Sequence, residues 1–260
     1  MKVRSYDPRM LGTGSATARG IAHSCFARRA KRILALCFFS LLLVGCRSET
    51  LFQSSFNSNT VGAPPSPNQL VGTVSVAGET GSVVVVPTPP NATSDQWVRI
   101  SRQSKNTSPI STIQGNLAHL RGPGTYGLLA VLYIPKGSGL ASLDFQALNV
   151  TPTPQAFLHL DFASNYNNTG NNVVRINDQP NNFFGTFPND HPFTVSVGLD
   201  INPTSPVAHV QLFGTGTSGA ADIPLTPPAF AQQFGAVMFW MGFPWTGSFD
   251  VTDIVVTHHN

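Results

Sequence analysis

Short hydrophobic runs separated by turn-forming residues dominate the chain from about residue 70 onward. The runs are rich in β-branched and aromatic residues, and clusters of Pro, Gly, Asn and Ser recur between them. This pattern is typical of strands and turns in an all-β domain, because β-branched side chains fit a pleated surface. Eleven strands are predicted, at residues 71–76, 82–86, 97–102, 127–134, 140–148, 156–163, 173–177, 193–201, 207–213, 236–243 and 249–257.

Eleven strands are enough for two packed antiparallel sheets, so we predict a two-sheet antiparallel β-sandwich. Residues 77–81 read as a hairpin-like connection between the first two strands. Residues 228–234 are the one place where a turn or two of helix is expected.

Alternation of apolar and polar residues indicates which faces of the strands meet solvent. Residues 193–201 place a large apolar side chain at every second position, as expected for a strand with one buried face. Three other strands carry polar side chains opposite their apolar face, namely His159 and Asp161, Arg175 and Asn177, and His209 and Gln211. We predict that these six side chains contribute to a ligand-binding surface.

His159 and Asp161 are the most closely spaced of these polar side chains. Residues i and i+2 of a strand lie on one face, about 6.5 to 7 Å apart. The imidazole and the carboxylate could therefore converge on one ligand hydroxyl or one metal ion. The alternative, which we favour, is a half-exposed polar face on which His159 forms hydrogen bonds across strands.

The aromatic residues divide between core and surface. Residues 236–243 are apolar on both sides, which predicts a strand that is buried on both faces or covered by a loop. Trp245 follows a proline and precedes Thr246 and Gly247, so it is expected in a loop with an exposed ring. We predict that Trp245 is a further ligand-binding residue, whose ring could stack on a sugar.

The N-terminal region has a different pattern. Residues 33–45 form an apolar run that follows four basic residues and ends at Cys46. A membrane-spanning helix needs about 20 apolar residues, so this run is too short to span a bilayer. A basic segment, a short apolar segment and small residues at its end are typical of a secretory signal. Met10 is an alternative start to Met1.

The last four residues of this region, Leu43, Val44, Gly45 and Cys46, resemble the lipobox of bacterial lipoproteins. The resemblance implies cleavage before Cys46 and attachment of acyl chains such as palmitate to its thiol, which would anchor the protein firmly in a membrane. Arg47, in place of an aspartate, favours the outer membrane if the organism has one. The alternatives are a signal peptide without lipidation or an ordinary membrane anchor.

Charge and cysteine content agree with export. The whole chain has a net charge of +3, but residues 1–45 hold eight Lys and Arg against one Asp, so the rest of the chain carries −4. Without a dense basic patch, a nucleic-acid partner is not expected. Cys25 and Cys37 lie in the predicted leader, which leaves Cys46 as the single thiol of the mature chain.

Both ends of the mature chain resemble bacterial concanavalin-A-like (laminin-G-like) jelly rolls. Residues 56–65 look like the first strand and entry loop, and residues 247–256 look like the last strand, which pairs with the first in that family. We therefore predict a signal peptide at 1–45, a tether at 46–55 and the sandwich at 56–260. The family includes lectins, carbohydrate-binding modules, glycoside hydrolases and lyases, so the fold alone does not choose a function.

Catalysis and metal binding have weaker support. The glutamate motif of jelly-roll glucanases is absent, since Glu49 and Glu79 are the two glutamates of the chain, although Asp161 with Asp200 is a conceivable carboxylate pair. No cofactor is required, but a structural calcium ion is conceivable at Asp250 or Asp253. A lyase could draw on the chain's Tyr, His and Arg residues.

We therefore expect a lipid-anchored envelope lipoprotein whose non-catalytic β-sandwich binds glycan or another envelope component. The alternatives are a structural or assembly lipoprotein that contacts other proteins, and a polysaccharide hydrolase or lyase.

Overall fold

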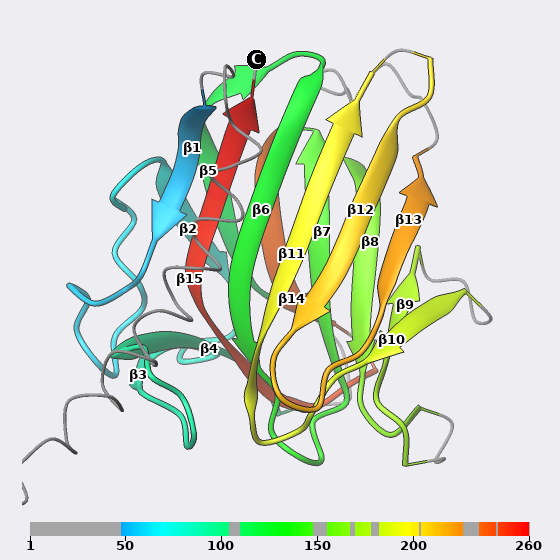
Figure 1. Ribbon diagram of the computed structural model, residues 1–260. Coiled ribbons are helices and arrows are strands. Elements are labelled where there is room, and N and C mark those ends of the chain that lie inside the picture. The colour runs from blue at the N-terminus through cyan, green and yellow to red at the C-terminus, as the bar shows by residue number, and fades with distance from the viewer. Residues whose placement is uncertain are drawn as a thin grey trace, which may run out of the picture. The chain divides into compact units, whose positions relative to one another are not determined.

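The computed structural model describes residues 48–103, 110–147, 155–166, 170–177, 182–202, 204–225, 234–242 and 244–259. Cys46, the predicted leader and residues 228–233 lie outside the described residues. The described part consists of two antiparallel sheets packed face to face, which confirms the predicted two-sheet β-sandwich of the jelly-roll type (Figure 1). In this part of the chain, no helix has the length and apolar character needed to cross a membrane.

Fifteen strands make up the described sheets. They are β1 (Ser48–Ser54), β2 (Thr73–Ala77), β3 (Val83–Pro87), β4 (Gln96–Arg102), β5 (Ser111–Arg121), β6 (Gly124–Tyr133), β7 (Leu140–Ala147), β8 (Gln155–Ala163), β9 (Val173–Ile176), β10 (Phe183–Thr186), β11 (Pro192–Ile201), β12 (Val207–Phe213), β13 (Ala220–Pro224), β14 (Phe234–Met241) and β15 (Gly247–His259).

One sheet has eight strands and the other has seven. The eight-stranded sheet runs β13-β12-β11-β6-β15-β4-β3, with β1 also paired to β15, and the seven-stranded sheet runs β10-β9-β8-β7-β14-β5-β2. The long strand β15 connects several partners, because its first half pairs with β4, its second half pairs with β1, and β6 follows its other edge.

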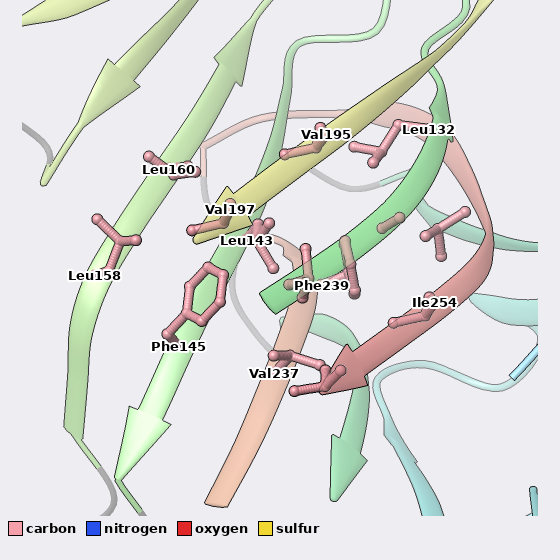
Figure 2. Close-up of a cluster of buried hydrophobic side chains, with 14 of the residues drawn as sticks. Leu132, Leu143, Phe145, Leu158, Leu160, Val195, Val197, Val237, Phe239 and Ile254 are labelled. Atoms are coloured by element: carbon pink, nitrogen blue, oxygen red, sulfur yellow. The ribbon is translucent and has the colours of Figure 1, made fainter. Parts of the chain in front are cut away.

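The core lies between the two sheets and is filled by the alternating apolar side chains. Leu143 and Phe145 of β7 are 0% exposed and face Val195 and Val197 of β11, which are 0% and 1% exposed (Figure 2). Burying such a side chain contributes about 1.5 to 3 kcal/mol, so this interface supplies most of the driving force for folding. The alternation read from residues 193–201 is confirmed by their strictly alternating burial.

All eleven predicted strands are present, but β1, β5, β10 and β13 were not predicted. The tether proposed for residues 46–55 is wrong for Ser48–Ser54, because these residues form β1 and pair with β15. Leu51 and Phe52 of β1 are 0% exposed. Residues 56–65 are therefore not the first strand; the first and last strands do pair, but the first is β1.

The predicted hairpin at residues 77–81 is also wrong. β2 pairs with β5 in the seven-stranded sheet, whereas β3 pairs with β4 in the eight-stranded sheet. The connection therefore crosses from one sheet to the other. Two short apolar runs close in sequence resemble a hairpin unless their partners elsewhere in the chain are known.

Candidate functional site

The outer face of the seven-stranded sheet carries a row of polar and aromatic side chains. Trp240 pairs with Ser142, Ser142 with Asp161, and both Asp161 and Phe183 pair with Arg175. Directly opposed residues of antiparallel strands project from the same face. The row therefore runs across β14, β7, β8, β9 and β10.

His159 lies between two carboxylates on this face. Its Nδ1 forms a hydrogen bond with Asp144 of the neighbouring strand, and its Nε2 lies 2.9 Å from Oδ1 of Asp161. Trp240 donates a hydrogen bond of 3.0 Å from its indole nitrogen to the other oxygen of Asp144. His159, Asp144 and Asp161 are 8%, 6% and 0% exposed. The favoured expectation of a cross-strand hydrogen bond at His159 is thus confirmed, although the face is buried rather than half-exposed.

Asp161 is held by three neighbours. Besides the contact with His159, it accepts a hydrogen bond of 2.6 Å from the hydroxyl of Ser142 and another from the guanidinium of Arg175. Two cationic side chains and two carboxylates therefore form one buried network, which we call the His159 network: Asp144, His159, Asp161 and Arg175.

Burial and ion pairing act in opposite directions on His159. Burial disfavours the charged imidazolium and lowers its pKa, but the hydrogen bonds and charges of Asp144 and Asp161 outweigh burial and raise the pKa to about 10. For Asp161, burial favours the neutral acid, yet the contacts with His159, Ser142 and Arg175 keep its pKa below the ordinary value. His159 is therefore charged at neutral pH.

Asn177 supports the network from the end of β9. Its side-chain oxygen accepts a hydrogen bond of 3.0 Å from the backbone nitrogen of His159, and its own backbone nitrogen donates to the carbonyl of His159. Asn177 has a φ of 51°, which asparagine tolerates better than most residues. It fixes the backbone of β8 beside the network.

A pocket of about 390 Å³ opens at one end of this sheet. The loops before β7, after β8 and before β15 contribute to it, together with β9. The residues that line it are Gly139, Leu140, Ala163, Ser164, Asn165, Tyr166, Arg175 and Trp245. Arg175 thus belongs both to the pocket and to the His159 network.

Trp245 forms one wall of the pocket with an exposed aromatic ring. Its side chain is 42% exposed, which confirms the prediction of an exposed ring in a loop. A Cβ placed on Gly139 would lie 2.9 Å from the Trp245 ring, so the absence of a side chain at Gly139 allows the ring to pack there. The loop is held by a hydrogen bond of 3.0 Å from the backbone nitrogen of Trp245 to the carbonyl of Gly242.

Tyr166 and Phe183 extend the aromatic surface past Arg175. Tyr166 lines the pocket, and its ring centroid lies 6.0 Å from that of Phe183. Phe183 is 51% exposed and stands opposite Arg175 in the sheet. Arg175 and these aromatic side chains therefore share one surface of the sheet.

His209 and Gln211 do not belong to this site. They lie on β12 of the eight-stranded sheet, and both are exposed on its outer face. His209 contacts Asp222 of β13 at 2.7 Å. The alternation of β12 resembles that of β8, but the two strands are in different sheets, so the prediction that these residues share a surface with His159 is wrong.

Asp250 and Asp253 occupy separate environments on β15. Asp250 is 0% exposed, and both of its oxygens accept hydrogen bonds of 2.8 Å from Arg99. Asp253 has a φ of 49° and accepts a hydrogen bond of 2.5 Å from the hydroxyl of Ser94. Among the described residues, no group of three or more His, Cys, Asp or Glu could hold a metal ion.

Asp144 and Tyr166 are the main residues of the site that the sequence did not single out as part of one surface. Asp144 lies in the middle of β7, where the polar residues Ser142, Asp144 and Gln146 alternate with apolar ones although the whole strand is buried. Tyr166 lies beside an asparagine-rich segment that reads as a surface loop. This alternation of polar and apolar residues was the available signal for Asp144.

No family model and no curated protein matches the chain. Similar solved structures include a conserved carbohydrate esterase of the Shiga toxin-encoding bacteriophage phi24B, with a TM-score of 0.52 and 14% identity over 82% of this chain and 99% of that chain. They also include lectin II from Ulex europaeus, with a TM-score of 0.47 and 11% identity over 82% of this chain and 98% of that chain. The match to the phage protein supports a shared β-sandwich fold and, at this identity, the fold alone.

Proposed function

We propose that this chain binds glycans through the pocket beside Trp245 and that a lipid on Cys46 anchors it in the cell envelope. The observation that carries the binding proposal is the exposed Trp245 ring at the wall of a pocket that also offers hydroxyl, amide and guanidinium groups. The similar structures contribute the fold and nothing about the ligand.

The pocket combines the two kinds of contact that a sugar needs. An exposed indole offers a flat apolar surface for the C–H face of a sugar ring, at little cost in conformational entropy. Ser164, Asn165 and Tyr166 place hydrogen-bonding side chains on the same pocket. A volume of about 390 Å³ lies within the usual range for small-ligand sites.

Catalysis has less support than binding. Asp161 and Asp200, the carboxylate pair that the sequence left conceivable, lie on β8 and β11 in different sheets and cannot flank one glycosidic bond. Among the described residues that line the pocket, none is a carboxylate. Asp144 and Asp161 are buried and held by His159.

Trp245 of the pocket and the start of β1 lie at opposite ends of β15. Arg47 alone separates Cys46 from β1, and Ser48 of β1 pairs with His259 at the end of β15. Trp245 lies just before the start of β15, which is 13 residues long and spans up to about 40 Å at the usual rise of a strand.

The binding proposal is tested on a glycan array with the full-length protein purified in detergent. Trp245→Ala should weaken binding to every retained glycan by about tenfold, since it removes the aromatic wall. Phe213→Ala is the matched control, because Phe213 is 46% exposed on the other sheet. Retention of no glycan, or equal losses in the two variants, would refute the proposal.

The anchoring proposal is tested by metabolic labelling with a palmitate analogue. The wild-type chain should take up the label and fractionate with membranes. Cys46→Ala should lose the label and accumulate as an unprocessed precursor. A Cys46→Ala protein that is processed and membrane-bound like the wild type would exclude lipidation at this residue.

A further inference from the structure

Arg175 is the one ionised group among the described residues that line the pocket. The other lining residues are neutral, so the charge of a bound molecule is sensed mainly by this guanidinium. Its side chain is 17% exposed, whereas that of its counterion Asp161 is 0% exposed. The cation therefore lines the pocket, whereas its buried counterion does not.

The negative charge of Asp161 is shared. The same carboxylate accepts a hydrogen bond from Arg175 and contacts His159, which has a second carboxylate partner in Asp144. Within the His159 network, Asp144, His159 and Asp161 are buried, and Arg175 is the member that lines the pocket. This arrangement directs a positive field into the pocket, where partial exclusion of water strengthens it.

Aromatic side chains share this surface with Arg175. Trp245 forms one wall of the pocket, while Tyr166 and the half-exposed Phe183 lie close together at 6.0 Å, with Phe183 opposite Arg175 in the sheet. One ring can cover one sugar unit. Two aromatic positions on one surface, Trp245 and the Tyr166–Phe183 pair, therefore fit a chain of sugars better than a single one.

We propose that the pocket selects an acidic oligosaccharide, in which the carboxylate of a uronic-acid-type residue pairs with Arg175 while neighbouring sugars stack on Trp245 and on the Tyr166–Phe183 pair. This inference rests on the proposed glycan binding and adds the chemical class of the ligand. A planar guanidinium matches a carboxylate in shape as well as in charge, so Arg175 distinguishes the acid from its neutral analogue.

The test compares each acidic polymer with its own carboxyl-reduced form, which keeps the linkages and removes the charge. Pectate, alginate and hyaluronan are used with the full-length protein in detergent, and affinity is measured by affinity electrophoresis. At least one acidic polymer should bind about tenfold or more tightly than its reduced form. The difference should shrink between 50 and 500 mM salt, because screening weakens a partly exposed charge pair.

Variants assign the selectivity to Arg175. Arg175→Gln should bring the ratio between acidic and reduced polymer close to one, while Arg175→Lys keeps part of it. If Arg175→Gln does not fold because Asp161 loses its partner, the double variant Arg175→Gln with Asp161→Asn removes both charges and keeps the hydrogen-bonding groups. Arg121→Gln is the control, since Arg121 pairs with Glu49 on β1 and lies outside the pocket lining.

The outcomes separate this inference from the function on which it rests. Equal binding of acidic and reduced polymers, or a preference for neutral glycans that Trp245→Ala abolishes, would overturn the acidic ligand and leave glycan binding standing. Selectivity that survives Arg175→Gln would overturn the role of Arg175. Failure to retain any acidic or neutral glycan would overturn both proposals.

Discussion

Replacing His159 by leucine should destabilise the fold and change how its stability depends on pH. The substitution removes the cation between Asp144 and Asp161, which are 6% and 0% exposed. Asp161 keeps Ser142 and Arg175, but the charge balance of the network is lost. Breaking a buried ion pair by removing one partner costs about 3 to 5 kcal/mol, and we expect a loss in this range at pH 7.

The wild-type protein should show the complementary pH dependence. His159 has a folded pKa of about 10 against an ordinary value of 6.5. A raised pKa stabilises the fold fully below the unfolded value of 6.5, and this stabilisation is lost as the pH rises through the folded value. By this linkage the free energy of unfolding falls by about 2 to 3 kcal/mol between pH 7 and pH 9.

Urea denaturation followed by tryptophan fluorescence measures both effects. His159→Leu should lose the decline between pH 7 and 9 and become more stable as the pH falls, because an uncompensated buried carboxylate takes up a proton. His209→Leu is the matched control: its partner Asp222 is exposed, with side chains 57% and 76% exposed, so it should cost less than about 0.5 kcal/mol. A wild-type stability that is flat from pH 7 to 9, or equal costs in the two variants, would refute the network.

Three further perturbations test other parts of the account. Arg99→Met should lower the free energy of unfolding in urea by about 1 to 3 kcal/mol, because it leaves the carboxylate of Asp250 buried at 0% exposure without its partner. Adding Asp250→Asn should recover part of this loss, whereas an Arg99→Met variant as stable as the wild type would argue against the ion pair. Gly185→Ala should destabilise the fold by about 1 to 3 kcal/mol and lower its melting temperature, since φ is +59° and the new Cβ would clash with the backbone oxygen of Ser218. The control Gly198→Ala should leave the melting temperature nearly unchanged; equal melting temperatures of the two variants would contradict this reasoning. Deleting residues 1–55 should lower the free energy of unfolding by several kcal/mol relative to deleting residues 1–46, because it removes the fully buried side chains of Leu51 and Phe52. Equal stability of the two deletions would indicate that Ser48–Ser54 act as a tether and not as a strand of the fold.

The sequence predicted the strands whose alternation is local. The alternation of apolar and polar residues at 193–201 predicts one buried face, and in the structure that face packs in the core. The strand β5 was missed because polar residues and Gly115 interrupt its pattern. Gly115 is required there since a Cβ would lie 2.8 Å from the ring of Phe52 on β1, a contact between distant segments that no local pattern contains.

The same limit applies to the site. The spacing of His159 and Asp161 predicted that both share one face, which is correct. Their partner Asp144 is set by the register between β7 and β8, and the pairing of strands far apart in sequence does not follow from residue spacing. For the same reason His209 could not be assigned to its sheet, although its strand alternates like β8.

Glycan binding at Trp245 is the central claim, and the indole N–H signals of the three tryptophans test it most directly. A retained oligosaccharide is titrated into the ¹⁵N-labelled protein, with Trp245→Phe used to assign one signal. Trp97 is an internal reference, because it is 1% exposed and its indole donates to the carbonyl of Ser94. The account predicts a saturable shift of the Trp245 signal with Trp97 unmoved; bound oligosaccharide with the Trp245 signal unchanged would contradict it.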